Sequence, residues 1–485
     1  MPVLMQSERL SRKNVWGYAF GAIPTGLLGF VFSFKYIEFF FDDLALLPSF
    51  FIAGQIIYMT VNSLNDPLSG QLSDRTNRER WGSRRLIYIK YGGPIWALTF
   101  LLVWFPWSLT NQVIIFIHYV VTICLFDTMY TLVILLWLAL LAEMTMDIDE
   151  RNKTQFFATV LGTMVTLPAF IAIASMPPNS DDFRMIMLVF AAISTVFILL
   201  TAFMCEEKPE FQHDEVYSLK ESIVATFKSR TFLIYAGFYL CQNLLGSLGL
   251  SYFFVYLLLL ESITPGLDII LLFFAIYFIV GYLGNIIAMK LRPKWGMRRI
   301  MLRFGSLRVI GSLILFGIIL VPSLEWLIWH GLIIVTLASG YGVFHIPMQY
   351  LAIDEDEVLY GSRREGMFIG VMALLTRPGT SLGPIIATFV LTTFGYIQGG
   401  ALSVQPESAL LGIKILWLLV PALVATLSLV FIYFYPLHGE KLAEMQDKLS
   451  KLHEKKRAAL IGATSSDSDS LDMSAGSAND SGHDN

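Results

Sequence analysis

Two apolar stretches of the chain carry carboxylate and amide side chains that are costly to place in a membrane. They are Asn62, Asn65 and Asp66 within residues 48–73, and Asp127 within 111–142. A charge near the centre of a bilayer costs about 2.5–3.5 kcal/mol, so such residues usually serve a site. Asn62 and Asp66 are four residues apart, which places their oxygens on one helical face, and oxygen ligands suit Na⁺ or a proton. We therefore expect Asp66 to belong to a cation-binding site.

A second candidate site combines Arg377 with Asp127, two charges at similar depth in opposite halves of the chain. We expect both to line a central cavity and bind substrate, the alternative being a permanent structural bridge between them. His345 is equally open to a site role and to a role as a core histidine. Lys35 and Glu38 are three residues apart and can pair along one helical face. Lys35 is also a candidate for substrate binding.

The composition of the 485 residues is that of a polytopic membrane protein. Hydrophobic residues make up 55% and charged residues only 15%, with a mean hydropathy of +0.63. A soluble protein has about 25% charged residues, because its surface needs them. The net charge of −4 is too small to indicate a nucleic-acid partner. The three cysteines form no CxxC pair, which argues against a zinc or redox centre.

About twenty apolar residues are needed to cross a bilayer as a helix. That window predicts twelve spans, which are 15–41, 48–73, 86–107, 111–142, 154–175, 185–205, 231–260, 267–291, 299–321, 324–353, 364–394 and 408–435. Most Lys and Arg residues fall on the side of the two termini, which predicts that both termini are cytoplasmic. We expect an all-α protein of the cell membrane, monomeric, with the lipid bilayer around it.

The chain divides into two similar halves. Arg78-Glu-Arg-Trp-Gly-Ser-Arg-Arg85 follows the second span, and Arg292-Pro-Lys-Trp-Gly-Met-Arg-Arg299 follows the eighth, with five of eight positions identical. A parallel repeat of six spans plus six is typical of major-facilitator transporters. The predicted units are an N-terminal half 1–205, a middle loop 206–230, a C-terminal half 231–435, and a tail 436–485 that begins as a basic helix and ends in a disordered Ser/Asp-rich segment.

Charged residues at the predicted inner helix ends and loops could close the cytoplasmic side through breakable ion pairs. The candidate gate residues are Asp74, Arg75, Arg84, Arg85, Glu143, Arg151, Arg298, Arg299, Asp354, Arg363 and Arg364. Retention of positive charge inside the cell explains the basic members equally well, and both explanations can hold.

The chain resembles the glycoside–pentoside–hexuronide:cation symporter family of the major facilitator superfamily, which includes melibiose permease. The motifs that carry the resemblance are Asn65-Asp-Pro-Leu-Ser-Gly70, Asp74-Arg-Thr76, Trp81-Gly-Ser-Arg-Arg85, Glu143-Met-Thr145, Glu150-Arg151 and Gly361-Ser-Arg-Arg-Glu-Gly366. The resemblance implies a cation site at Asn62, Asn65, Asp66 and Thr131. It implies a substrate site near Gly26, Asp127, Tyr130, Trp137, Gln155, His345 and Arg377.

Three positions depart from the family pattern. Asn62 and Gly26 stand where the family has Asp, and Gln155 stands where it has Arg. The loss of a carboxylate at position 62 weakens the case for Na⁺ and favours proton coupling or uniport. A galactoside is therefore not the expected substrate, although a sugar or sugar acid remains the family default.

No phosphate-binding loop, nucleophile elbow or HExxH motif occurs in the sequence, so we expect neither an enzyme nor a cofactor, and no metal beyond Na⁺. The expected function is cation-coupled symport of a sugar, glycoside or related small organic solute, with Na⁺ or H⁺ as the coupling ion. The alternatives are a lysolipid carrier of the same family, suggested by the 14% aromatic residues, and a membrane sensor that kept the fold.

Overall fold

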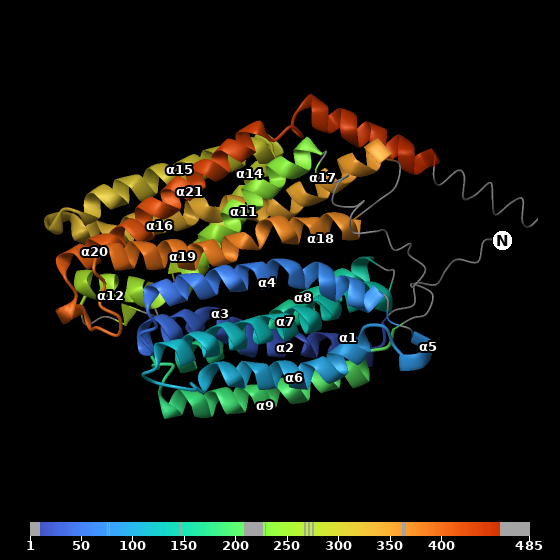
Figure 1. Cartoon of the computed structure of the whole chain (residues 1–485). Helices are drawn as coiled ribbons and strands as arrows, with labels where there is room; N and C mark the ends of the chain where they lie inside the picture. The colour runs from blue at the N-terminus through green and yellow to red at the C-terminus, as the bar shows by residue number, and fades with distance from the viewer. Residues whose placement is uncertain are drawn as a thin grey trace, which may run out of the picture.

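The computed structural model describes residues 10–74, 76, 78–145, 148–207, 227, 229–265, 268–269, 272–273, 276–360 and 365–455. Across these ranges the regular structure is helical, and none of them forms a strand. The helices form two bundles that lie against each other, with α1–α9 in one and α11–α21 in the other (Figure 1). Most of the predicted middle loop and the end of the tail lie outside the described residues.

The first bundle begins with one long helical crossing, Arg12–Asp43, that changes its winding along its length. Its segments are α1 (Arg12–Phe20), α2 (Ala22–Pro24), η1 (Thr25–Gly29), α3 (Phe30–Ile37) and η2 (Glu38–Asp43). The other helices of this bundle are α4 (Pro48–Asp74), α5 (Arg78–Trp81), α6 (Leu86–Trp104), α7 (Gln112–Met144), α8 (Ile148–Ile173) and α9 (Asp181–Met204). Asn111 and Ser180 cap the starts of α7 and α9 with their side-chain oxygens.

The second bundle repeats this plan with more interruptions. Its segments are α11 (Arg230–Ser251), α12 (Phe253–Ile263), η4 (Ile276–Val280), α14 (Gly281–Trp295), α15 (Met297–Ile319), η5 (Pro322–Leu327), α16 (Ile328–Ala338), η6 (Ser339–Phe344), α17 (His345–Tyr360), α18 (Glu365–Thr376), α19 (Pro378–Thr393), η7 (Leu402–Val404), α20 (Glu407–Lys414), η8 (Ile415–Leu419) and α21 (Val420–Phe434). A further helix over 440–455 follows, which agrees with the basic helix predicted for the tail.

Ten helical stretches within the described residues are long and apolar enough to cross a membrane. Each of the ten overlaps one of the twelve predicted spans. The other two predicted spans coincide with α4 and with the segment that contains η4 and α14. Helix α4 is 27 residues long, but Asn62, Asn65 and Asp66 lower its hydropathy. Part of the remaining span, 267–291, lies outside the described residues.

The two bundles meet along α4, which packs against α18 and α19, while α3 packs against α11. Arg377 is the residue between α18 and α19, where Pro378 begins the new helix. Proline is favoured at a first helical position because its missing N–H is not needed there. This arrangement places Arg377 on the face that receives α4.

Candidate functional site

Arg377 and Asp66 form an ion pair between the two bundles. The Arg377 Nε lies 3.0 Å from Asp66 Oδ2, and its Nη2 lies 2.9 Å from the same oxygen. The Asp66 side chain is 9% exposed, while that of Arg377 is 36% exposed and borders a cavity. A charge-assisted contact of this geometry is about twice as strong as a neutral hydrogen bond. The pair therefore links α4 of one bundle to the α18–α19 junction of the other.

Asp127 is held by neutral donors of its own bundle. The Tyr58 hydroxyl donates to Asp127 Oδ1 at 3.1 Å, and the Asn65 amide donates to Oδ2 at 2.9 Å. Thr128 in turn donates to the Asn65 carbonyl oxygen at 3.3 Å. Arg377 and Asp127 line the same cavity, as expected, but the direct ion pair of Arg377 is with Asp66 and not with Asp127. The reason is packing, because α4 lies against α18 and α19 and brings Asp66 to Arg377 first.

The four residues expected to bind a cation separate into two groups. Asn62 donates to the Thr380 hydroxyl at 3.3 Å, and both Asn62 Oδ1 and Asp66 Oδ1 are buried without a hydrogen-bond partner. The Asn65 amide instead donates to Asp127, and Thr131 is buried on α7 one turn beyond Asp127. These two oxygens, one helical turn apart in the sequence, are of the type that binds a small cation. The second Asp66 oxygen is already engaged by the Arg377 guanidinium.

A cavity of about 340 Å³ lies beside the ion pair. Both bundles contribute to its wall, which consists of Gly29, Phe32, Ser33, Tyr36, Tyr58, Asn62, Phe126, Asp127, Tyr130, Gln242, Asn243, Gly246, Ser247, Arg377 and Thr380. The Gln242 Nε2 is buried in the structure without a partner. The cavity thus offers both charges of the expected substrate site and an unused amide donor to a polar solute.

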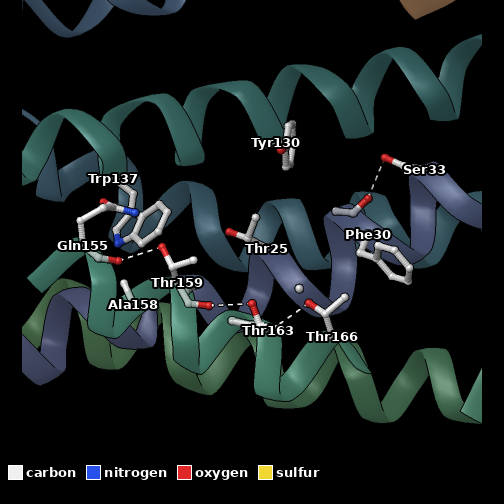
Figure 2. A pocket seen from close by; sticks show the side chains of 14 residues that line it. Thr25, Phe30, Ser33, Tyr130, Trp137, Gln155, Ala158, Thr159, Thr163 and Thr166 are labelled. Carbon is white, nitrogen blue, oxygen red and sulfur yellow. Dashed lines mark hydrogen bonds between the residues drawn. The ribbon is translucent and has the colours of Figure 1, made fainter. Parts of the chain in front are cut away.

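A second pocket, of about 430 Å³, lies between the first crossing, α7 and α8 (Figure 2). Besides Tyr130, its hydroxyl-bearing residues are the serine and threonines Thr25, Ser33, Thr159, Thr163 and Thr166. Each donates its proton to a backbone carbonyl one turn earlier, at 2.9 to 3.2 Å. Their oxygens keep lone pairs for hydrogen-bond donors from a ligand. The two pockets share Gly29, Ser33 and Tyr130, so they adjoin.

Trp137 and Gln155 lie at one end of this second pocket, where both form hydrogen bonds with Tyr18. The Trp137 indole donates to the Tyr18 carbonyl at 2.9 Å, and the Tyr18 hydroxyl donates to Gln155 Oε1 at 2.7 Å. The Tyr18 and Trp137 rings also stack, with centroids 4.9 Å apart. The expected substrate residues Trp137, Gln155 and Tyr130 are therefore brought together.

Gly26 lies at the close contact between the first crossing and α8. A Cβ at this position would approach Thr166 Oγ1 to 2.5 Å and the Gly162 carbonyl oxygen to 3.1 Å. A side chain there requires the Thr166 side chain to rotate away or α8 to shift. The absence of the family's Asp at position 26 therefore has a steric basis, and the room next to it is filled by the hydroxyl of Thr166.

Two residues expected at the substrate site lie elsewhere. Lys35 is 1% exposed and donates to Glu38 at 2.7 Å and to the carbonyls of Ala174 and Met176 at 3.2 and 3.1 Å. The predicted pairing of Lys35 with Glu38 is confirmed, and it ties the first crossing to the end of α8. His345 bonds the Gly342 carbonyl at 2.8 Å and stacks on Tyr239. Neither Lys35 nor His345 lines either pocket.

Several candidate gate residues make contacts within their own bundle where the structure describes them. Glu207 accepts the backbone N–H groups of Arg84, Arg85 and Leu86 at 2.7 to 2.8 Å. Arg151 donates to the Thr145 carbonyl at 2.7 Å.

In the second bundle, Arg298 donates to the carbonyls of Ile432 and Tyr433. Arg299 is exposed, and Asp354 is half-buried on α17. The remaining gate residues, or their side chains, lie outside what the structure describes, namely Asp74, Arg75, Glu143, Arg363 and Arg364. The gate remains a prediction.

Sequence reasoning missed a set of contacts between the bundles at the opposite end. Asp42 Oδ1 accepts the Tyr396 hydroxyl at 3.1 Å and the Gly399 N–H at 2.8 Å. The Gln398 amide donates to two carbonyls of the 41–46 segment, at 2.7 and 3.0 Å. We call these contacts of Asp42, Tyr396, Gln398 and Gly399 the terminal latch. Only the acidic Asp42 at the end of the first crossing could have drawn attention to it.

Comparison with known proteins identifies the family to which this chain belongs. A family model described as "MFS/sugar transport protein" matches residues 17–439. The chain belongs to this family. It is 27% identical to an uncharacterized symporter, sll1374, of Synechocystis sp. (strain PCC 6803), over 89% of this chain and 95% of that protein. It is 23% identical to a glucuronide carrier protein homolog of Escherichia coli K12, over 90% of this chain and 95% of that protein.

The solved structure of a D-xylose-proton symporter shares the fold, with a TM-score of 0.56 and 14% sequence identity. The match covers 87% of this chain and 97% of that one. The predicted all-α major-facilitator fold and the predicted resemblance to symporters of this superfamily are thereby confirmed. The protein is a multi-pass membrane transporter.

Proposed function

We propose that this transporter is a cation-coupled symporter of a sugar, glycoside or sugar acid, working by alternating access between the two bundles. The observation that carries the proposal is the Asp66–Arg377 ion pair, which joins the bundles at the wall of the central cavity. A transporter that rocks one bundle against the other needs a contact there that both ion and solute can change. The names of the two relatives, a symporter and a glucuronide carrier homolog, support this assignment.

Coupling would follow from competition for Asp66. A proton or Na⁺ that binds Asp66, with Asn62 Oδ1 as a second ligand, weakens the attraction of Asp66 for Arg377. The freed guanidinium can then donate to paired oxygens of a solute, which its planar fork suits. Because ion and solute favour the same rearrangement of Arg377, each raises the affinity for the other.

The solute class follows from the second pocket. Its wall combines six hydroxyl groups, five of Ser and Thr and one of Tyr130, with the Gln155 amide and the Trp137 ring, and includes no charged side chain. Such a wall favours a neutral ring with several hydroxyl donors over a lysolipid tail. Any acidic group of the solute would lie in the adjoining cavity, at Arg377. Both spaces have the size of small-molecule sites, about 300–1,000 Å³, whereas a sensor would need neither.

We further propose that the protein resides in the cell membrane as a monomer with both termini cytoplasmic. The distribution of Lys and Arg supports this orientation. The terminal latch would then close the extracellular end in the state described here, and its opening would admit solute from outside.

The test is uptake into proteoliposomes of a panel of labelled sugars, glycosides, glucuronides and lysolipids, with Na⁺ and pH gradients imposed separately. Accumulation of one hydroxylated solute above its equilibrium level under one of these gradients is the expected result. Gradient-driven uptake of lysolipid alone would overturn the substrate class. Equal distribution of every solute under both gradients would overturn symport.

A further inference from the structure

A pocket of about 450 Å³ lies far from the transport cavity, where the tail leaves the second bundle. The start of α11, the end of α21 and the start of the 440–455 helix form its wall. The lining residues are Arg230, Tyr433, Phe434, Tyr435, Pro436, His438, Gly439, Glu440 and Lys441. None of them borders the two pockets of the proposed transport site.

The pocket is surrounded by positive charge. Arg230 and Lys441 are the cationic residues of its wall, and Glu440 is the one carboxylate among its lining residues. Burial lowers the pKa of the His438 imidazole. The positive charges of Arg298, Lys441 and Arg299 lower it further, so His438 adds no positive charge of its own. The 440–455 helix also begins here, and the N–H groups of its first turn add partial positive charge.

The pocket stands at the level of a bilayer surface. The last membrane-spanning stretch ends at Phe434, and the stretch containing α11 begins at Arg230. Tyr433 and Phe434 are 60% and 54% exposed, as expected of an aromatic belt at the membrane interface. The Arg298 guanidinium lies over the Tyr433 ring, 5.3 Å from its centroid. Lipid headgroups would therefore reach the pocket directly.

The tail helix is held in place beside the pocket by contacts of its own. Met445 is 6% exposed and packs in the core of the second bundle, with Leu442 next to it. Farther along, His453 contacts Glu357 of α17 at 3.2 Å. The Tyr435 hydroxyl donates to the Met348 carbonyl at 3.1 Å, which fixes the turn before the helix. The helices that form the pocket wall are thus held together by specific contacts.

We propose that this pocket binds the phosphate headgroup of an anionic phospholipid. Arg230 and Lys441 supply the charge that the phosphate needs, Tyr433 and Phe434 contact the upper part of its chains, and the tail helix closes the site. Basic pockets at the ends of membrane helices are suited to such headgroups. Free phosphate offers the same charge but lacks the acyl chains that the aromatic side chains would contact.

The test compares lipid retention by the purified full-length protein in nanodiscs or detergent, using phosphatidylglycerol and phosphatidylcholine as probes and native mass spectrometry as the readout. The test variant is Arg230→Gln/Lys441→Gln. The matched control is Lys448→Gln/Lys455→Gln, which removes two exposed charges from the same tail helix outside the pocket. Arg230→Lys/Lys441→Arg keeps both charges and checks that the site tolerates substitution.

The wild type, the control and the charge-conserving variant should retain phosphatidylglycerol in preference to phosphatidylcholine. The test variant should lose more than about tenfold in occupancy, since each basic side chain near an anionic headgroup contributes about fivefold. Equal retention by the test variant and its control would overturn the proposal. Displacement of the lipid by inorganic phosphate or glycerol 3-phosphate would overturn the assignment to a lipid.

Discussion

Arg377 holds Asp66, 311 residues earlier in the chain, through two contacts of 2.9 and 3.0 Å across the boundary between the bundles. Asp127 instead accepts hydrogen bonds from Tyr58 and Asn65. The carboxylate on α4 is therefore the one that meets the guanidinium, and the carboxylate on α7 stays within its own bundle. One oxygen of Asp66 is bound and the other is buried without a partner, so an arriving cation can bind it before the arginine leaves.

A double-mutant cycle would measure how strongly this pair holds the bundles together. We expect Asp66→Asn to lower the free energy of unfolding by about 1–2 kcal/mol, because Arg377 keeps its charge without its partner. The loss stays below the 3–5 kcal/mol of fully buried pairs, since Arg377 is 36% exposed. Asp66→Asn/Arg377→Gln should recover most of the stability in thermal unfolding. Strictly additive effects of the two substitutions would show that the pair does not form.

The residue at position 62 should determine how the protein responds to Na⁺. Asn62 Oδ1 is neutral and lies one turn from Asp66, so Asn62→Asp adds the second carboxylate that Na⁺ prefers. Uptake by this variant should become more strongly stimulated by Na⁺ than that of the wild type. The measurement is uptake against Na⁺ concentration at fixed pH, with Thr60→Asp, an exposed position on the same helix, as the control. A flat response in Asn62→Asp would place the cation elsewhere.

Gly26 should be intolerant of a side chain. Gly26→Ala places a Cβ at 2.5 Å from Thr166 Oγ1, and overpacking of this kind costs about 1–3 kcal/mol. Uptake should fall because α8 is pushed away from the second pocket, and Thr166→Ala in the same chain should restore part of it. Gly317→Ala is the control, since nothing lies within 4 Å of a Cβ there. If Gly26→Ala transports as well as Gly317→Ala, α8 does not pack as described.

The terminal latch should set the balance between the two open states. Asp42→Ala removes the acceptor for Tyr396 and Gly399, two hydrogen bonds of about 1 kcal/mol each, and should shift the population toward the state open at that end. A cysteine at Gly246, which lines the cavity with free space around it, reports this shift through its rate of labelling by a membrane-impermeant thiol reagent.

The labelling experiment needs a background without the native Cys124, Cys205 and Cys241. Asp43→Ala is the matched control, because Asp43 accepts the Asn179 N–H at 2.8 Å within the first bundle. Faster labelling in Asp42→Ala than in Asp43→Ala is expected. Equal rates in both variants would show that the latch does not control access.

Local signals in the sequence are sufficient to predict most of the fold. Span positions follow from hydropathy over windows of about twenty residues, and the Lys35–Glu38 pair follows from a three-residue spacing on one helix. Partners across the bundle boundary depend on how helices pack, which no local pattern encodes. Similar depth in opposite halves of the chain suggests Asp127 as the partner of Arg377, whereas the packing of α4 against α18 and α19 brings Asp66 to it.

The same limit applies to the rest of the candidate site. Trp137, Gln155 and Tyr130, which are expected at the substrate site, line one pocket because neighbouring helices of one bundle form it. Lys35 is expected there as a charge within a span and His345 from the family resemblance, yet Lys35 is engaged by Glu38 and the His345 Nδ1 by the Gly342 carbonyl. The terminal latch joins Asp42, at the end of η2, to residues more than 350 positions later in the loop after α19, a pairing that no local pattern encodes.

The role of Asp66 in coupling is tested most directly in proteoliposomes that contain either the wild type or Asp66→Asn. One assay measures accumulation of a labelled solute under an imposed cation gradient. A second assay measures exchange of the same solute across the membrane without a gradient. The wild type should concentrate the solute. Asp66→Asn should lose concentrative uptake and retain exchange, because the variant keeps the cavity but cannot bind the driving ion. Undiminished accumulation by Asp66→Asn would contradict the account, since the ion would then act without Asp66.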